Sequence, residues 1–205
     1  VIPQTLRRTD FLITVSEFTR REVIDFFAWP ADKVSAIPLG VDSAFRPHSV
    51  SETEPVLQRL GLQHSAYVLC TATIEPRKNI ARLLQAYAAL PAALRTQFPL
   101  VLAGGEGWND TDLQIQIQRA ISAGWLKRIG YVPEADLPAL MAGARCFAFP
   151  SIYEGFGLPV LEAMASGVPV VTSHVASLPE VAQDCAQLVD PYDVDAIRTA
   201  LLRAI

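Results

Sequence analysis

The sequence predicts an α/β fold, a Rossmann-like doubly wound parallel sheet with helices on both faces. From about residue 67 onward, short apolar runs alternate with stretches of helical periodicity. The apolar runs are continuous, as in strands that are buried on both faces. A chain of 205 residues with 51% hydrophobic residues, 11 Gly and 15 Pro has an ordinary globular composition and can bury one good core.

The expected elements follow one another as strand and then helix along the chain. We expect strands at residues 67–71, 100–103, 128–131, 146–149, 169–172 and 187–189, and helices at residues 80–89, 112–123, 134–142, 158–166 and 193–204. Repeated strand-helix units produce right-handed crossovers and hence a parallel sheet. The fourth helix has clear boundaries, because Pro159 suits a first turn and Gly167 suits a left-handed C-terminal cap.

The beginning of the chain has a different pattern. We expect a buried strand and then a helix in residues 11–27, and an extended segment in residues 33–39. Residues 40–55 are rich in Ser, Glu and Pro, which is typical of a linker or long loop. We therefore place the boundary of the compact domain near residue 55, between residues 1–54 and residues 55–205. The absence of an initiating Met fits a piece of a longer chain.

Composition argues against several kinds of partner. With a formal net charge of -4, the chain lacks the broad basic face of a nucleic-acid-binding protein. No apolar run reaches the length of a membrane span, and no targeting segment is recognisable. The three cysteines, Cys70, Cys146 and Cys185, are odd in number and far apart, which predicts small buried thiols in a reducing compartment. We therefore expect a cytoplasmic protein.

The loops that follow the strands are where a doubly wound sheet binds its ligands. After the first of these strands, Arg77 and Lys78 precede a helix expected to start near Asn79. Two cations beside the free N–H groups of a helix start form a suitable anion site. A solvated basic turn with a helix cap at Asn79 is an alternative that the local sequence leaves open.

A glycine-rich turn follows the second strand. Gly104, Gly105 and Gly107 allow close approach of backbone to a ligand, although an ordinary turn explains them equally well. The dinucleotide-binding fingerprint is absent from the chain. Trp108 in this turn is either a packing residue or a platform for a sugar.

Two glutamates lie near the start of the fourth helix. Glu154 precedes that helix and Glu162 lies about one turn inside it. Carboxylates at this place can accept hydrogen bonds from the hydroxyls of a polyol, and Gly155 and Gly157 leave the intervening N–H groups accessible. The alternative is a capping carboxylate at Glu154 and an exposed helix residue at Glu162.

The spacing of these glutamates resembles a family signature. The run Glu154-Gly-Phe-Gly-Leu-Pro-Val-Leu-Glu-Ala-Met-Ala-Ser-Gly-Val-Pro-Val is similar to that of retaining GT-B glycosyltransferases of the GT4 family (glycosyl transferases group 1). The resemblance extends in order to Ser16-Glu-Phe-Thr-Arg-Arg-Glu, Ile37-Pro-Leu-Gly-Val-Asp, Glu75-Pro-Arg-Lys-Asn, Leu102-Ala-Gly-Gly and Gly130-Tyr-Val-Pro. It spans nearly the whole chain and implies the C-terminal, donor-binding half of a GT-B fold.

The resemblance implies roles for the residues that match. Lys78 and Arg77 would hold the diphosphate of a nucleotide sugar, and Glu162 would bind the ribose hydroxyls. The donor hexose would contact Glu154 and the backbone of Gly155, Phe156, Gly157 and Leu158, the base would contact the backbone near Val132, and Gly104 and Gly105 would line the donor site. Many members carry an arginine where this chain has Thr73, and Arg77 would replace it.

The Glu-Pro-Arg-Lys-Asn run resembles mannosyltransferases most, so GDP-mannose is the favoured donor and a UDP-sugar the alternative. No further cofactor and no metal are expected, because no cluster of ligating side chains has metal-site spacing. The acceptor would be a glycan or lipid-linked glycan bound through an N-terminal domain outside this chain. The isolated piece would then be inactive, and the intact enzyme would associate peripherally with a membrane.

Two other functions remain open on the same fold. One is another sugar-nucleotide enzyme, an epimerase or a phosphorylase, and the other is a non-catalytic nucleotide-binding module. A phosphorylase would need pyridoxal phosphate held by a lysine.

Overall fold

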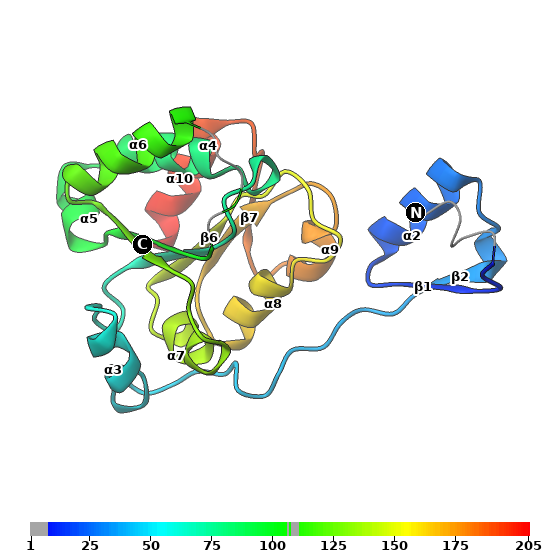
Figure 1. The fold of residues 1–205 in the computed structure, drawn as a ribbon, viewed down its shortest axis with the longest axis horizontal. Coiled ribbons are helices and arrows are strands. Elements are labelled where there is room, and N and C mark those ends of the chain that lie inside the picture. The colour runs from blue at the N-terminus through cyan, green and yellow to red at the C-terminus, as the bar shows by residue number, and fades with distance from the viewer. Residues whose placement is uncertain (1–7, 106, 108–110) are drawn as a thin grey trace.

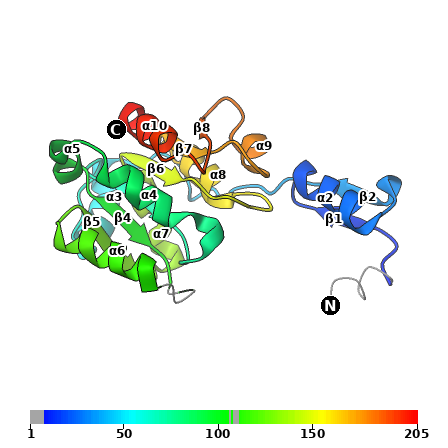
Figure 2. The same ribbon diagram turned by 90° about the horizontal axis from the view of Figure 1, so that it is seen from above.

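The structure, a computed structural model, describes residues 8–105, 107 and 111–205. Its main part is a parallel sheet between two layers of helices (Figures 1 and 2). The strands are β3 (Val68–Thr71), β4 (Leu100–Ala103), β5 (Leu126–Gly130), β6 (Cys146–Phe149), β7 (Val170–Ser173) and β8 (Gln187–Val189). They lie in the order β5-β4-β3-β6-β7-β8, and every neighbouring pair is parallel. The predicted doubly wound fold is confirmed.

The strand order reverses in the middle of the sheet. Strands β3, β4 and β5 extend in one direction and β6, β7 and β8 in the other, so β3 and β6 are direct neighbours. Val68 pairs with Cys146 and Leu69 with Phe147. In open α/β sheets, a crevice forms beyond the carboxyl ends of the two strands at such a reversal. The loops that follow β3 and β6 are therefore the first place to look for a site.

The helices cover both faces of the sheet. They are α3 (Val50–Arg59), α4 (Ile80–Ala88), α5 (Ala92–Gln97), α6 (Thr111–Ser122), α7 (Leu137–Ala142), α8 (Leu158–Ala165), α9 (Leu178–Ala182) and α10 (Val194–Ala204), with short 3₁₀ turns at η2 (Pro76–Lys78) and η3 (Glu134–Asp136). A further 3₁₀ turn, η1 (Ala31–Lys33), lies in the N-terminal part of the chain. In the part of the chain that the structure describes, no helix has the length and apolar character needed to cross a bilayer.

Each face of the sheet has its own core. Helices α4, α6 and α10 pack on one face, where β3 contributes Val68 and Cys70. Helices α3, α7, α8 and α9 pack on the other, where the same strand contributes Leu69. Successive side chains of a strand point to opposite faces of the sheet. Because both faces are covered by helices, the side chains on both faces must be apolar. This explains why the strand sequences are continuous apolar runs.

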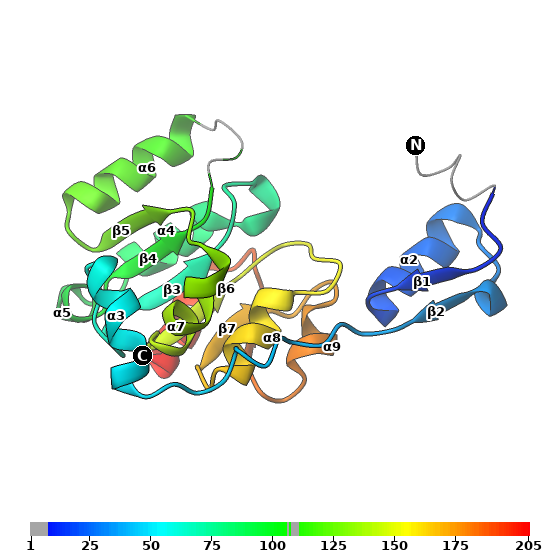
Figure 3. The same cartoon turned by 60° about the horizontal axis from the view of Figure 1, so that its bottom comes forward.

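A small unit at the beginning of the described chain lies apart from the main sheet, as Figure 3 shows. Strands β1 (Leu12–Thr14) and β2 (Val34–Ala36) pair in parallel, and α2 (Glu17–Phe27) connects them. Ser16 caps α2 by accepting a hydrogen bond from the backbone N–H of Thr19. The expected strand, helix and extended segment are thus all present.

Three helices differ from expectation. Helix α3 includes residues 50–55, which the composition assigns to a linker, because Ser49 and Glu52 form a reciprocal capping box. The serines and glutamates that suggested a linker are partly the start of this helix. Helices α5 and α9 were not expected either. They have 6 and 5 residues, too few to show a helical period.

The prediction of buried thiols is correct for two of the three cysteines. Cys70 and Cys146 are buried in the core, and burial raises the pKa of each thiol to about 12. Cys185 is exposed, so the prediction is wrong there. It lies between α9 and β8, outside any strand, so no neighbouring layer covers it.

Candidate functional site

The loops after β3, β6 and β8 are joined by hydrogen bonds at the carboxyl edge of the sheet. The carbonyl of Arg77 accepts from the backbone N–H of Ile152 at 2.7 Å and from the hydroxyl of Ser151 at 2.8 Å. The amide of Asn79 donates to the carbonyls of Pro150 and Pro191 at 2.9 and 2.6 Å. Asn79 precedes α4, but its side chain does not cap that helix and instead connects the neighbouring loops.

These loops bring together three side chains singled out in the sequence. The ammonium group of Lys78 lies 2.6 Å from one carboxylate oxygen of Glu154, and Arg77 lies 2.8 Å from the other. The hydroxyl oxygen of Ser151 also lies 2.8 Å from Glu154, so its single proton is shared between this carboxylate and the carbonyl of Arg77. The side chains of Lys78 and Glu154 are nearly buried, whereas that of Arg77 is 42% exposed. Arg77 also pairs with Glu75.

The loop from Glu154 to Gly157 has its carbonyl groups fixed by hydroxyls. The hydroxyl oxygen of Ser177 lies 2.8 Å from the carbonyl oxygens of both Glu154 and Phe156. The carbonyl of Gly155, between them, accepts from Ser16 and Thr19 of the N-terminal unit at 2.6 and 3.0 Å. In a planar trans peptide the C=O and the next N–H point in opposite directions. Each N–H of this loop therefore points away from the hydroxyl that binds the preceding carbonyl.

Helix α8 begins directly after this loop. Gly157 has φ of 105°, and a Cβ there would lie 2.7 Å from Leu178. Pro159 lies in the first turn and Gly167, with φ of 74°, follows the helix, as predicted. Leu158 is the first residue of α8, so the N-terminus of this helix, with its partial positive charge, lies next to the loop that carries Glu154.

Glu162 lies further along α8 and faces another neighbour. Its pKa is raised, chiefly because burial disfavours the charged carboxylate and secondarily because Glu134 is close. Glu134 follows the loop after β5, two residues beyond the buried Val132. The electrostatic neighbour of Glu162 thus follows the β5 loop, whereas Glu154 is paired with the cations of the β3 loop.

The glycine-rich turn packs against the loop after β3. Gly104 has φ of 143°, and a Cβ there would overlap the carbonyl of Ala72. A Cβ on Gly107 would overlap the carbonyl of Ile74, whereas Gly105 has open space. Close packing thus accounts for two of these glycines. Trp108 lies outside the described residues.

Sequence reasoning did not identify Ser151, Ser177 or the hydroxyl contacts of Ser16 and Thr19 with this loop. Ser151 and Ser177 are single hydroxyl residues to which the sequence assigned no role. Ser16 and Thr19 lie in the run Ser16-Glu-Phe-Thr-Arg-Arg-Glu, which resembles the family and predicts a helix start, but nothing in it indicated a contact with this loop.

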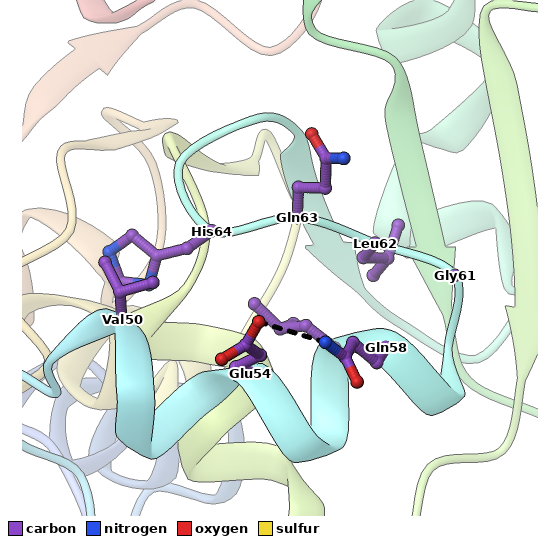
Figure 4. Close-up of a pocket in the computed structure, with 8 residues that line it drawn as sticks. Val50, Glu54, Gln58, Gly61, Leu62, Gln63 and His64 are labelled. Carbon is purple, nitrogen blue, oxygen red and sulfur yellow. Dashed lines mark hydrogen bonds between the residues drawn. The ribbon is translucent and has the colours of Figure 1, made fainter.

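A separate cavity of about 660 Å³ lies beside α3 (Figure 4). Its lining residues are Val50, Glu54, Leu57, Gln58, Gly61, Leu62, Gln63 and His64. Gln63 and His64 precede β3, so the cavity lies at the amino end of that strand. Ligands of doubly wound sheets bind at the opposite edge, so this cavity is not part of the candidate site.

No group of three or more His, Cys, Asp or Glu side chains within residues 8–105, 107 and 111–205 is arranged to hold a metal ion.

Comparison with known proteins agrees with the geometry. The chain is 48% identical over 202 residues to O-antigen chain mannosyltransferase B of Escherichia coli. The alignment covers 98% of this chain and 53% of that protein. It is 33% identical over 205 residues to the GDP-mannose-dependent alpha-(1-6)-phosphatidylinositol monomannoside mannosyltransferase of Mycolicibacterium smegmatis, covering 94% and 52%. The chain thus spans about half the length of these relatives.

Solved structures show the same architecture. The crystal structure of Anabaena HepE in complex with UDP superposes with a TM-score of 0.81 at 25% identity, over 95% of this chain and 54% of that one. The sequence model of glycosyl transferases group 1 matches residues 57–205, which include the strands and helices on both sides of the reversal. With the paired glutamates and the parallel sheet, this match shows that the chain belongs to the glycosyl transferases group 1 family.

Proposed function

We propose that this chain is the donor-binding half of a retaining mannosyltransferase, with GDP-mannose as the donor. Residues 55–205 form the nucleotide-sugar-binding domain, and residues 1–54 are the end of the acceptor-binding domain and the linker. The observation that carries the proposal is the meeting of Lys78, Arg77 and Glu154 beyond β3 and β6. The strand order reverses at this point, where doubly wound sheets bind their ligands.

The two cations act on the leaving group. Transfer of the sugar breaks the bond between the anomeric carbon and the diphosphate, so negative charge grows on the phosphate oxygens. Lys78 and Arg77 lie on the loop after β3 and stabilise this charge, and the N–H groups at the start of α8 add their dipoles. A diphosphate carries more negative charge than one carboxylate, so it competes with Glu154 for both cations.

The loop before α8 holds the hexose. The carboxylate of Glu154 and the N–H groups of Gly155, Phe156, Gly157 and Leu158 offer acceptors and donors for the sugar hydroxyls. None of the described residues accepts a backbone hydrogen bond from the N–H groups of residues 155–157. These groups are therefore available to a ligand.

The nucleoside extends toward the β5 loop. Glu162 binds the ribose hydroxyls, and the backbone near Val132 contacts the base. The raised pKa of Glu162 supports this role, because a half-buried carboxylate beside a second acidic group gains from two hydroxyl donors. Gly104 and Gly105 line the same edge from the β4 loop.

The identity of the donor is supported by the relatives. The mannosyltransferase of M. smegmatis is named as GDP-mannose-dependent, whereas HepE is solved with UDP. GDP-mannose is favoured because the relative at 48% identity is also named as a mannosyltransferase. The acceptor is a polysaccharide or lipid-linked glycan, bound with the help of a further domain and reached by peripheral association of the intact enzyme with a membrane.

Calorimetric titration of this chain tests the proposal. GDP, UDP and ADP, together with GDP-mannose and UDP-glucose, are titrated under one buffer condition. We expect GDP and GDP-mannose to bind most tightly and the Lys78→Ala variant to lose most of this affinity. If UDP and UDP-glucose bind more tightly than GDP and GDP-mannose, the donor is a UDP-sugar and the assignment of GDP-mannose is wrong. Absence of binding to all five compounds would contradict the proposed function.

A further inference from the structure

The start of α2 is held by the main domain. The carboxylate of Glu180, in α9, accepts from the backbone N–H groups of Glu17 and Phe18 at 2.8 and 3.1 Å. Ser16 accepts the next N–H, that of Thr19, at 3.0 Å. The first turn of a helix has free N–H groups that need partners. Two of these N–H groups of α2 therefore bind one carboxylate from the other part of the chain.

The same helix start holds the loop before α8. Ser16, which is fully buried, donates to the carbonyl of Gly155 at 2.6 Å, and Thr19 donates to it at 3.0 Å. Nearby, Tyr153 donates a hydrogen bond to Glu22, and its ring packs edge-on against that of Phe18. The contacts of α2 thus converge on the loop that carries Glu154.

The orientation of one peptide group follows from these contacts. Fixing the carbonyl of Gly155 toward α2 fixes the N–H of Phe156 in the opposite direction, because the peptide is planar and trans. The two neighbouring carbonyls, of Glu154 and Phe156, depend on Ser177, which belongs to the main domain itself. Among the hydrogen bonds of the described residues, the carbonyl of the middle peptide is the one that the N-terminal unit holds.

We propose that Ser16 and Thr19 are positioning residues for the donor loop, residues 153–157, and that binding of the donor sugar depends on docking of α2. This inference rests on the proposed function, because it assumes that the loop contacts the hexose of a nucleotide sugar. The diphosphate and nucleoside contact other residues, so GDP alone is bound independently of Ser16 and Thr19. Loss of the α2 contact therefore weakens binding of the sugar part selectively.

Thr19→Val is the clean variant for a test, since it keeps the side-chain shape and leaves the cap acceptor of Ser16 in place. Thr19→Ser retains the hydroxyl and serves as the rescue variant. Thr96→Val makes the same chemical change on an exposed turn of α5, away from the site, and serves as the matched control. Ser16→Ala is a second variant that removes both the donor and the cap.

The first measurement is the backbone ¹⁵N order parameter of residues 153–158 in the unliganded chain, which reports the mobility of the loop without requiring its N–H groups to be hydrogen-bonded. We expect lower order parameters in Thr19→Val, wild-type values in Thr96→Val, and recovery in Thr19→Ser. Unchanged order parameters of the loop in Thr19→Val overturn the inference. This readout needs no ligand, so it decides whether α2 holds the loop even if the proposed function is wrong.

The second measurement compares the affinities for GDP-mannose and GDP by calorimetry. Thr19→Val is expected to weaken GDP-mannose binding roughly 3- to 10-fold, the effect of one lost hydrogen bond, and to leave GDP binding unchanged. Equal weakening of both ligands indicates a general structural defect and overturns the positioning role. A wild-type chain that binds neither ligand refutes the proposed function, and the order parameters alone then decide whether α2 holds the loop.

Discussion

The ammonium group of Lys78 and the carboxylate of Glu154 are 2.6 Å apart, with side chains only 12% and 11% exposed. This ion pair joins the loop after β3 to the loop after β6, across the point where the strand order reverses. Removing one member of a nearly buried pair leaves the other charge without compensation. Substitutions at these positions should therefore affect stability, and also the proposed binding of the donor.

Glu154→Gln should lower the stability of the unliganded chain. Lys78 loses its ionic partner, at a cost of about 1–3 kcal/mol because the pair is partly screened by solvent. This corresponds to a decrease in Tm of roughly 3–10 °C. A saturating concentration of GDP should raise the Tm of the variant more than that of the wild type, because the diphosphate replaces the missing charge. If GDP raises the Tm of both proteins equally, the diphosphate does not compete with Glu154 for Lys78. The control is Glu54→Gln, which makes the same chemical change on the exposed face of α3.

Lys78→Ala should weaken GDP binding by about 1–3 kcal/mol, or roughly 5- to 150-fold, since a charge-assisted hydrogen bond to phosphate is lost. Arg77→Ala should have a smaller effect, because the Arg77 side chain is 42% exposed and more strongly screened. Isothermal calorimetry measures the affinity of both variants for GDP. Lys33→Ala, which removes an exposed lysine outside the site, is the control. An unchanged dissociation constant for Lys78→Ala would remove Lys78 from the phosphate site.

Glu162→Gln should stabilise the folded chain near neutral pH while weakening GDP binding. The pKa of Glu162 is raised in the folded state, so its stabilising contribution is complete below the ordinary value of 4.5 and is lost as pH rises through the raised value. Glutamine carries no charge at any pH. The Tm of the variant should therefore exceed that of the wild type at pH 7, and the difference should shrink toward pH 4. A difference that does not change with pH would contradict this explanation.

Gly157→Ala should destabilise the start of α8. Gly157 has φ of 105°, which an alanine adopts only with strain, and the new Cβ would lie 2.7 Å from Leu178. We expect a loss of about 1–3 kcal/mol in the free energy of unfolding, measured by urea denaturation. Gly40→Ala meets no atom within 4 Å and should be close to neutral. If both variants have wild-type stability, the left-handed conformation at Gly157 is not required.

Thiol labelling should distinguish the three cysteines. Cys185 is exposed and should react quickly in the native chain, whereas Cys70 and Cys146 are buried with a pKa of about 12 and should react only after unfolding. Titration with a chromogenic disulfide should give one fast equivalent in buffer and three in denaturant. Cys185→Ser should abolish the fast reaction.

Much of the fold could be predicted because burial on both faces leaves a strong sequence pattern. Strands such as β4 and β6 begin and end where their apolar runs do. Helix α8 was also delimited correctly, since Pro159 and Gly167 have defined roles at helix ends. The capping box of α3 was misread because the same Ser and Glu residues are common in linkers.

The candidate site was only partly predictable. Arg77, Lys78 and Glu154 were identifiable because each follows a strand, and parallel strands end at one edge. The contacts of the site's hydroxyls were not identifiable. Ser16 and Gly155 are 139 residues apart, and Ser177 is 23 residues from Glu154, so no local pattern connects them. Such contacts depend on tertiary packing alone.

The side chain of Asn79 has a consequence for the thermodynamics of binding. Its amide connects the loops after β6 and β8, while its own backbone belongs to the loop after β3. Three loops of the ligand edge therefore hold each other in place without a bound molecule. A ligand that enters here loses its own translational and rotational freedom, but the protein has little additional conformational entropy to lose. Binding should accordingly show a smaller entropic penalty than binding to a site whose loops order only around the ligand.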